Sequence, residues 1–85
     1  MSEKSEKLTA QQIEYYKKPA KGLAMTSKDM QAVDVDRFDE IQRQAQSDVE
    51  NKKKLADKST FKNDSEYKFY LLAAYDIAMA IEHGY

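Results

Sequence analysis

Apolar residues recur along this chain at intervals of three and four residues, the spacing that places side chains on one face of an α-helix. The pattern is clearest over 36–57, where Phe38, Ala45, Val49 and Ala56 fall within about 20° of one line. The other positions carry mostly Arg, Gln, Asp and Glu, so this segment should bury one narrow stripe. We predict a helix over 36–57.

The segment 65–83 differs because it is apolar almost all round. Asn63 and Glu66 can form a capping box at its start, and Gly84 stands where a left-handed residue commonly ends a helix. Such a helix lies at the centre of a bundle, or faces the core on one side and another chain on the other. We predict a helix over 65–83 at the centre of the fold.

Two shorter helices precede these. A capping box formed by Thr9 and Gln12 marks the start of a helix over 10–18, which Pro19 should end because the residue before a proline disfavours the helical conformation. A fourth helix is predicted over 27–33. Thr26 or Ser27 can cap this helix at its start, and Met30 and Val33 form its apolar pair.

The fold class predicted from these segments is all-α, a small bundle of three main helices and one short helix. Strands are not expected, because alternation is absent and two Gly are too few for hairpins. Short connections favour an up-down arrangement. Residues 1–7 contain only Met, Ser, Glu and Lys, so we predict a disordered tail there and a single domain over 8–85.

Composition excludes most catalytic and cofactor chemistry. The 85 residues include no Cys, one His and two Gly, which leaves no thiolate site and no Gly-rich phosphate loop. The acidic run 34–40 lacks the ligand spacing and the Gly of a calcium loop, and suits a helix N-terminus. His83 lies in the last predicted turn, where a cation-capable residue is ordinary. We therefore predict a protein that is not an enzyme, with no cofactor, metal or small-molecule substrate.

The chain also lacks the usual marks of membrane or secreted proteins. The most apolar stretch, 69–81, is too short to span a bilayer and contains Asp76. The first residues carry no apolar run of the kind found in secretory signals. We expect a cytoplasmic location without membrane contact.

Two lysine clusters, at 17–21 and 52–54, are the features that could contact phosphates. A nucleic-acid domain usually carries a clear basic excess, whereas this chain has a formal net charge of −1. A helix-turn-helix over 26–45 is also disfavoured, because its second helix would open with carboxylates that repel the DNA. Nucleic-acid binding is thus the alternative prediction, as a regulator that uses the lysine clusters.

The favoured prediction comes from the last helix. The polar stripe of this helix is thin, and Phe69, Leu72 and Ala80 surround Asp76 on it. The narrow apolar stripes of the other helices offer too few side chains to cover both this stripe and the broad apolar face of the last helix. Uncovered apolar strips mark interaction sites. Tyr85, at the chain end, adds an aromatic residue for such a surface. We predict a small protein–protein interaction module, such as an adaptor, an inhibitor or an assembly subunit, that binds a protein partner or self-associates.

Overall fold

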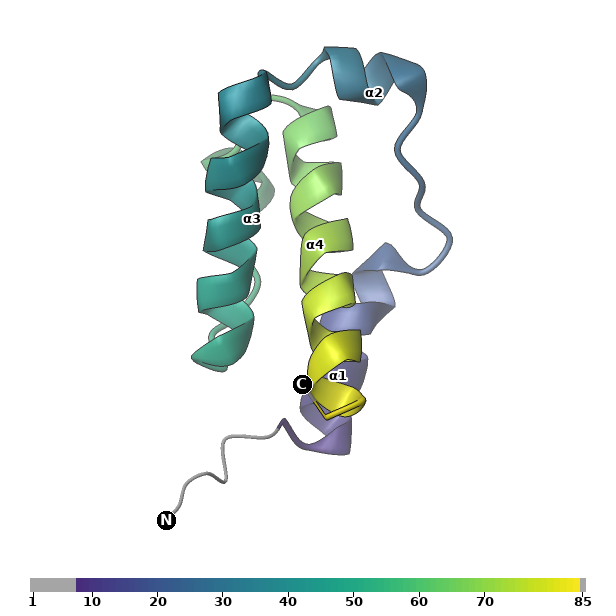
Figure 1. The fold of residues 1–85 in the computed structure, drawn as a ribbon, viewed down its shortest axis with the longest axis vertical. Helices are drawn as coiled ribbons and strands as arrows, with labels where there is room; N and C mark the ends of the chain where they lie inside the picture. The colour runs from purple at the N-terminus through teal and green to yellow at the C-terminus, as the bar shows by residue number, and fades with distance from the viewer. Residues whose placement is uncertain (1–7, 85) are drawn as a thin grey trace.

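The computed structural model describes residues 8–84, and over this range the fold is all-α, as predicted (Figure 1). Two short 3-10 turns, Lys18–Ala20 and Lys58–Thr60, interrupt the connections between the helices. The predicted tail at 1–7 lies outside the described residues. The helices are α1 (Ala10–Lys17), α2 (Ser27–Gln31), α3 (Val35–Glu50) and α4 (Asp64–Glu82).

α4 is the central element, as its composition predicted. α3 packs along it, α1 lies against its C-terminal half, and α2 crosses near its N-terminal end (Figure 1). The buried side of α4 is rich in alanine, which lets the neighbouring backbones approach closely. Its buried apolar residues are Tyr70, Leu71, Ala73, Ala74 and Ala78.

The predicted up-down arrangement is wrong, because α3 and α4 run in the same direction (Figure 1). Their first turns lie together, since Arg37 donates a hydrogen bond from Nε to Glu66 at 3.1 Å and the Phe38 and Phe69 rings are 4.8 Å apart. A return segment, residues 51–63, therefore brings the chain back along the length of α3 before α4 begins.

Chain length explains why α3 cannot continue to residue 57. Residues 51–63 can span up to roughly 43 Å, ample for a helix that is roughly 24 Å long. A helix over 35–57 would be roughly 34 Å long, and residues 58–63 could then return only roughly 20 Å. The parallel arrangement of α3 and α4 thus requires α3 to end early.

The end of α3 is closed by a Schellman motif that the sequence did not reveal. Lys53 donates its backbone N–H to the carbonyl of Asp48 at 2.8 Å, and Lys52 donates to Val49 at 3.1 Å. Lys52 takes the left-handed conformation, with φ of 58°, that glycine usually supplies. The predicted helix end at residue 57 is wrong, because the left-handed conformation of Lys52 ends the helix earlier. No Gly or Pro marks this earlier end in the sequence.

The predicted helix starts are largely confirmed. Thr9 and Gln12 form the reciprocal capping box, and Thr26 forms another with Asp29. Asn63 accepts the backbone N–H of Glu66, but the Glu66 side chain does not return to Asn63. It accepts instead from Arg37 and from the backbone N–H of Lys62, which satisfies a carboxylate that is 3% exposed.

α2 is anchored to α4 through the carboxylate of Asp29. Lys68 donates to this carboxylate at 2.6 Å and the Ser65 hydroxyl donates at 2.8 Å, while the backbone N–H of Thr26 donates from its own helix start. The hydrogen bond from Lys68, followed by those from Thr26 and Ser65, holds the pKa of Asp29 well below its ordinary value.

This depressed pKa predicts that α2 loses its anchor in acid. The ionised Asp29 stabilises the fold fully above the ordinary pKa of 3.8, and this contribution is lost as the pH falls through the lower pKa of the folded chain. Asp29→Asn keeps a capping side chain but removes the charge. The difference in free energy of unfolding between wild type and Asp29→Asn should therefore shrink between about pH 6 and about pH 2. A difference that is the same at both pH values would contradict this assignment.

Candidate functional site

The outward side of α4 carries the predicted interface and is named here the α4 strip: Leu72, Asp76, Met79 and Ala80. Asp76 is exposed, and the other three side chains are half-buried. Leu72 packs against the edge of the core, whereas Met79 and Ala80 lie outside the core cluster. The α4 strip is therefore an apolar surface around one exposed carboxylate, on the C-terminal half of the central helix.

Phe69 is less accessible than the sequence indicated. Its ring meets Phe38 edge to face, at 84° between the ring planes, and it packs against the core. Leu23, from the connection between α1 and α2, also packs against the core, which the helix stripes alone did not predict. Tyr85 lies outside the described residues. The structure thus brings Leu72, Asp76 and Ala80 together, places Phe69 at the margin and adds Met79.

Asp76 has no hydrogen-bond or ion-pair partner within residues 8–84. Burial of this carboxylate against a partner would require a specific hydrogen-bond donor, because an unpaired buried charge is costly. In the structure the carboxylate is exposed, so water can solvate it. Any donor that pairs with Asp76 would come from outside the described residues.

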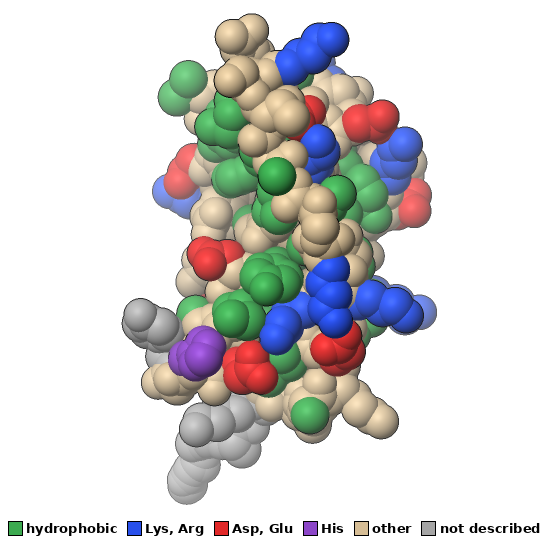
Figure 2. Space-filling model, turned by 90° about the vertical axis from the view of Figure 1, so that its right-hand side faces the viewer, with side chains coloured by type: hydrophobic (Ala, Val, Ile, Leu, Met, Phe, Trp, Pro, Cys, Tyr) green, Lys and Arg blue, Asp and Glu red, His purple; other side chains and the backbone are tan. Residues whose placement is uncertain are grey.

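Most of the first lysine cluster is neutralised. Lys17 forms an ion pair with Glu82 at 3.5 Å, and its ammonium lies 6.0 Å from the centre of the Tyr75 ring. Lys21 pairs with Glu14 at 2.8 Å, which raises the pKa of Lys21 and lowers that of Glu14. Figure 2 shows one face of the molecule, on which basic, acidic and hydrophobic side chains are interspersed. This mixture is unlike the continuous basic face of a nucleic-acid-binding domain.

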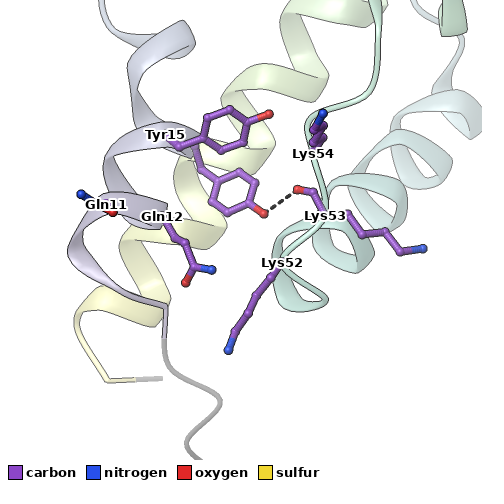
Figure 3. Close-up of a pocket in the computed structure, with 7 residues that line it drawn as sticks. Gln11, Gln12, Tyr15, Lys52, Lys53 and Lys54 are labelled. Atoms are coloured by element: carbon purple, nitrogen blue, oxygen red, sulfur yellow. Dashed lines mark hydrogen bonds between the residues drawn. The ribbon is translucent and has the colours of Figure 1, made fainter.

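The second lysine cluster lies beside α1 and forms what we name the basic corner: Tyr15, Lys52, Lys53 and Lys54. A shallow hollow of about 190 Å³ opens between the three lysines on one side and α1 on the other (Figure 3). Tyr15 lines it from α1, together with Gln11, Gln12 and Tyr16. All three lysines are exposed, and Tyr15 is 44% exposed. No ion pair within residues 8–84 involves these lysines.

Two adjacent tyrosines fix the backbone of the basic corner. Tyr16 is 2% exposed and donates its hydroxyl to the carbonyl of Lys53 at 2.6 Å (Figure 3). Tyr15 accepts the backbone N–H of Leu55 at 2.9 Å. Burial raises the pKa of Tyr16, so its hydroxyl keeps its proton and remains a donor. The hollow therefore has a defined backbone, while its lysine side chains extend into solvent.

A buried polar network lies behind the basic corner. Tyr70 is fully buried, donates its hydroxyl to Asp48 Oδ2 at 2.6 Å and accepts the backbone N–H of Ala56 at 2.8 Å. Gln44 donates to both oxygens of Asp48. Burial, and then the hydrogen bond to Asp48, raise the pKa of Tyr70. This network satisfies a buried carboxylate without a cation and ties the return segment to α3 and α4.

The described residues contain neither a cluster of potential metal ligands nor a membrane-spanning helix. Within residues 8–84 no three acidic or histidine side chains converge as metal ligands. His83 is exposed at the end of α4. None of the described helices is both long enough and apolar enough to cross a membrane.

Comparison with known proteins adds no functional assignment. No protein-family model matches this sequence, and no curated protein or solved structure is significantly similar to it.

Proposed function

We propose that this chain is a small, non-catalytic protein-binding module that uses the α4 strip. The observation that carries this proposal is Met79, an apolar side chain on the central helix that lies outside the core cluster and is half-buried, like Leu72 and Ala80 beside it. Methionine adapts its shape to a partner, and half-buried apolar side chains around a polar one suit a modest, reversible interface. The cytoplasmic location predicted from the sequence belongs to this proposal.

Nucleic-acid binding is the weaker candidate. The ion pairs of Lys17 and Lys21 leave the basic corner as the main source of unpaired lysines, and it covers only a small surface. Duplex binding through several phosphates needs a wider basic face.

Met79→Lys tests the proposal, because Met79 lies outside the core and a lysine there can extend into solvent. We expect this variant to keep its thermal midpoint within about 2 °C and to lose partner or self-association at least tenfold. Gln46→Lys on the exposed side of α3 is the matched control. Unchanged association in Met79→Lys, at unchanged stability, would contradict the proposal.

A further inference from the structure

The two ends of α3 carry opposite charges. Asp34, Asp36 and Asp39 are exposed around its first turns, and Lys52–Lys54 are exposed just beyond its last turn. α3 lies along the long axis of a molecule that measures 43 × 24 × 22 Å (Figure 1). The charges are therefore separated along the molecule, although the net charge is only −1.

The exposed apolar side chains gather at the same two ends. Val35, between two aspartates at the start of α3, is 84% exposed, and Met30 on the neighbouring α2 is 49% exposed. Tyr15, in the basic corner, is the third exposed large apolar side chain of the described residues. We name Met30, Asp34, Val35, Asp36 and Asp39 the acidic end. Asp39 pairs with Arg43 at 3.1 Å, so Asp34 and Asp36 are the unpaired carboxylates of the acidic end within residues 8–84. Each end thus combines an excess of one sign of charge with uncovered apolar surface.

The basic corner is shaped for an extended acidic surface. Its three lysine side chains point in different directions and do not converge on one position in the hollow (Figure 3). They can therefore contact several carboxylates spread over a surface better than they can hold a single anion. None of the residues that line the hollow is acidic, and the tyrosine hydrogen bonds fix its backbone.

We propose that the acidic end of one copy docks against the basic corner of a second copy, in a head-to-tail arrangement. Like charges repel when two identical ends meet, so charge complementarity favours opposite ends. Val35 and Met30 would then cover the exposed Tyr15 ring. The two surfaces differ, so the contact is heterologous and can continue to further copies. This contact does not involve the α4 strip and is independent of the proposed function.

The contact should be weak and sensitive to salt. Each surface comprises four or five side chains, well below the 20 to 30 residues per side of a stable interface. In sedimentation equilibrium at about 20 mM ionic strength, we expect the weight-average mass to rise between about 20 µM and about 2 mM chain. About 0.5 M salt should return the mass to the monomer value, because screening weakens contacts between exposed charges.

Charge reversal tests the pairing directly. Lys53→Glu with Lys54→Glu makes both ends acidic, and Asp36→Lys with Asp39→Lys makes both ends basic. Each variant alone should stay monomeric over the same range. An equimolar mixture should regain the rise in mass, because each variant supplies the end that the other lacks. Lys21→Glu with Lys58→Glu, at exposed positions outside both ends, is the control with the same change in net charge and should associate like the wild type.

Several results would overturn the proposal. A wild-type chain that is monomeric at all concentrations excludes the contact, and a mixture that stays monomeric excludes the pairing of ends. Oligothymidylate is the probe for nucleic acid. If it binds a monomeric wild type, and this binding is lost in Lys53→Glu with Lys54→Glu, the basic corner is a nucleic-acid site and the proposal is wrong. Met79→Lys should leave the head-to-tail contact intact, which separates a failure here from a failure of the α4 strip.

Discussion

Tyr70→Phe is expected to lower the free energy of unfolding by about 2–3 kcal/mol, although it removes a single oxygen atom. The hydroxyl donates to Asp48, a carboxylate that is 6% exposed, and accepts the backbone N–H of Ala56. Its loss leaves Asp48 with Gln44 as its remaining side-chain donor and leaves the N–H of Ala56 without its partner. Hydrogen bonds to buried charged groups contribute more than neutral ones, so this loss exceeds that of an average hydroxyl.

Urea unfolding of four chains measures this effect: wild type, Tyr70→Phe, Asp48→Asn and the double variant. The double variant should be more stable than the sum of the single losses implies, with a coupling of at least about 1 kcal/mol. Tyr15→Phe serves as the control, because its hydroxyl is at an exposed site and its loss should cost less than about 1 kcal/mol. Additive losses in the cycle would show that Tyr70 and Asp48 do not interact.

Ile41→Ala is expected to cost about 3 kcal/mol, within the range of 2–5 kcal/mol for truncated core side chains. Ile41 is 1% exposed and is one of the largest fully buried side chains, on the face of α3 that packs against α4. The alanines on the buried side of α4 are short, so they cannot extend to fill the space that is left. Arg43→Ala, at an exposed position of the same helix, should change stability by less than about 0.5 kcal/mol. Equal effects of the two substitutions would contradict the packing of α3 on α4.

Local signals in the sequence predicted the helix starts well. Thr9 with Gln12, and Thr26, are recognisable because a cap and its partner lie three residues apart. The central position of α4 was also predictable, because no polar face is wide enough to lie entirely in solvent. These features depend on neighbouring residues and on composition, which a single sequence contains.

The end of α3 and the direction of α4 depend on distant contacts and could not be predicted in this way. Residues 51–57 contain Lys, Leu and Ala, which favour a helix, and the left-handed Lys52 breaks that preference. The return segment is held by hydroxyls of Tyr15, Tyr16 and Tyr70, which are 14 to 40 residues away in the chain. The capacity of tyrosine to bond a backbone group was visible in the composition, but its partners were not.

The same dependence on distant contacts explains what the sequence did not reveal about the surroundings of the candidate site. Counting apolar stripes on the helices omitted Leu23 and Leu55, which lie outside helices and pack against the core. Phe69 is covered by the ring of Phe38 and packs against the core, whereas Met79 lies outside the core cluster. The basic corner was predicted only as a run of lysines, because its second side comes from α1.

Site-specific photocrosslinking tests the central claim, that the α4 strip is the functional surface, most directly. A photoreactive amino acid replaces Met79 in one chain and Gln46 in a control chain, and both are irradiated in the cells that naturally make the protein. We predict one dominant covalent product from position 79, absent from position 46 and lost when Leu72→Glu is added. A product that includes only this chain would identify the partner as a second copy. Equal products from positions 79 and 46, or none from position 79, would contradict the claim.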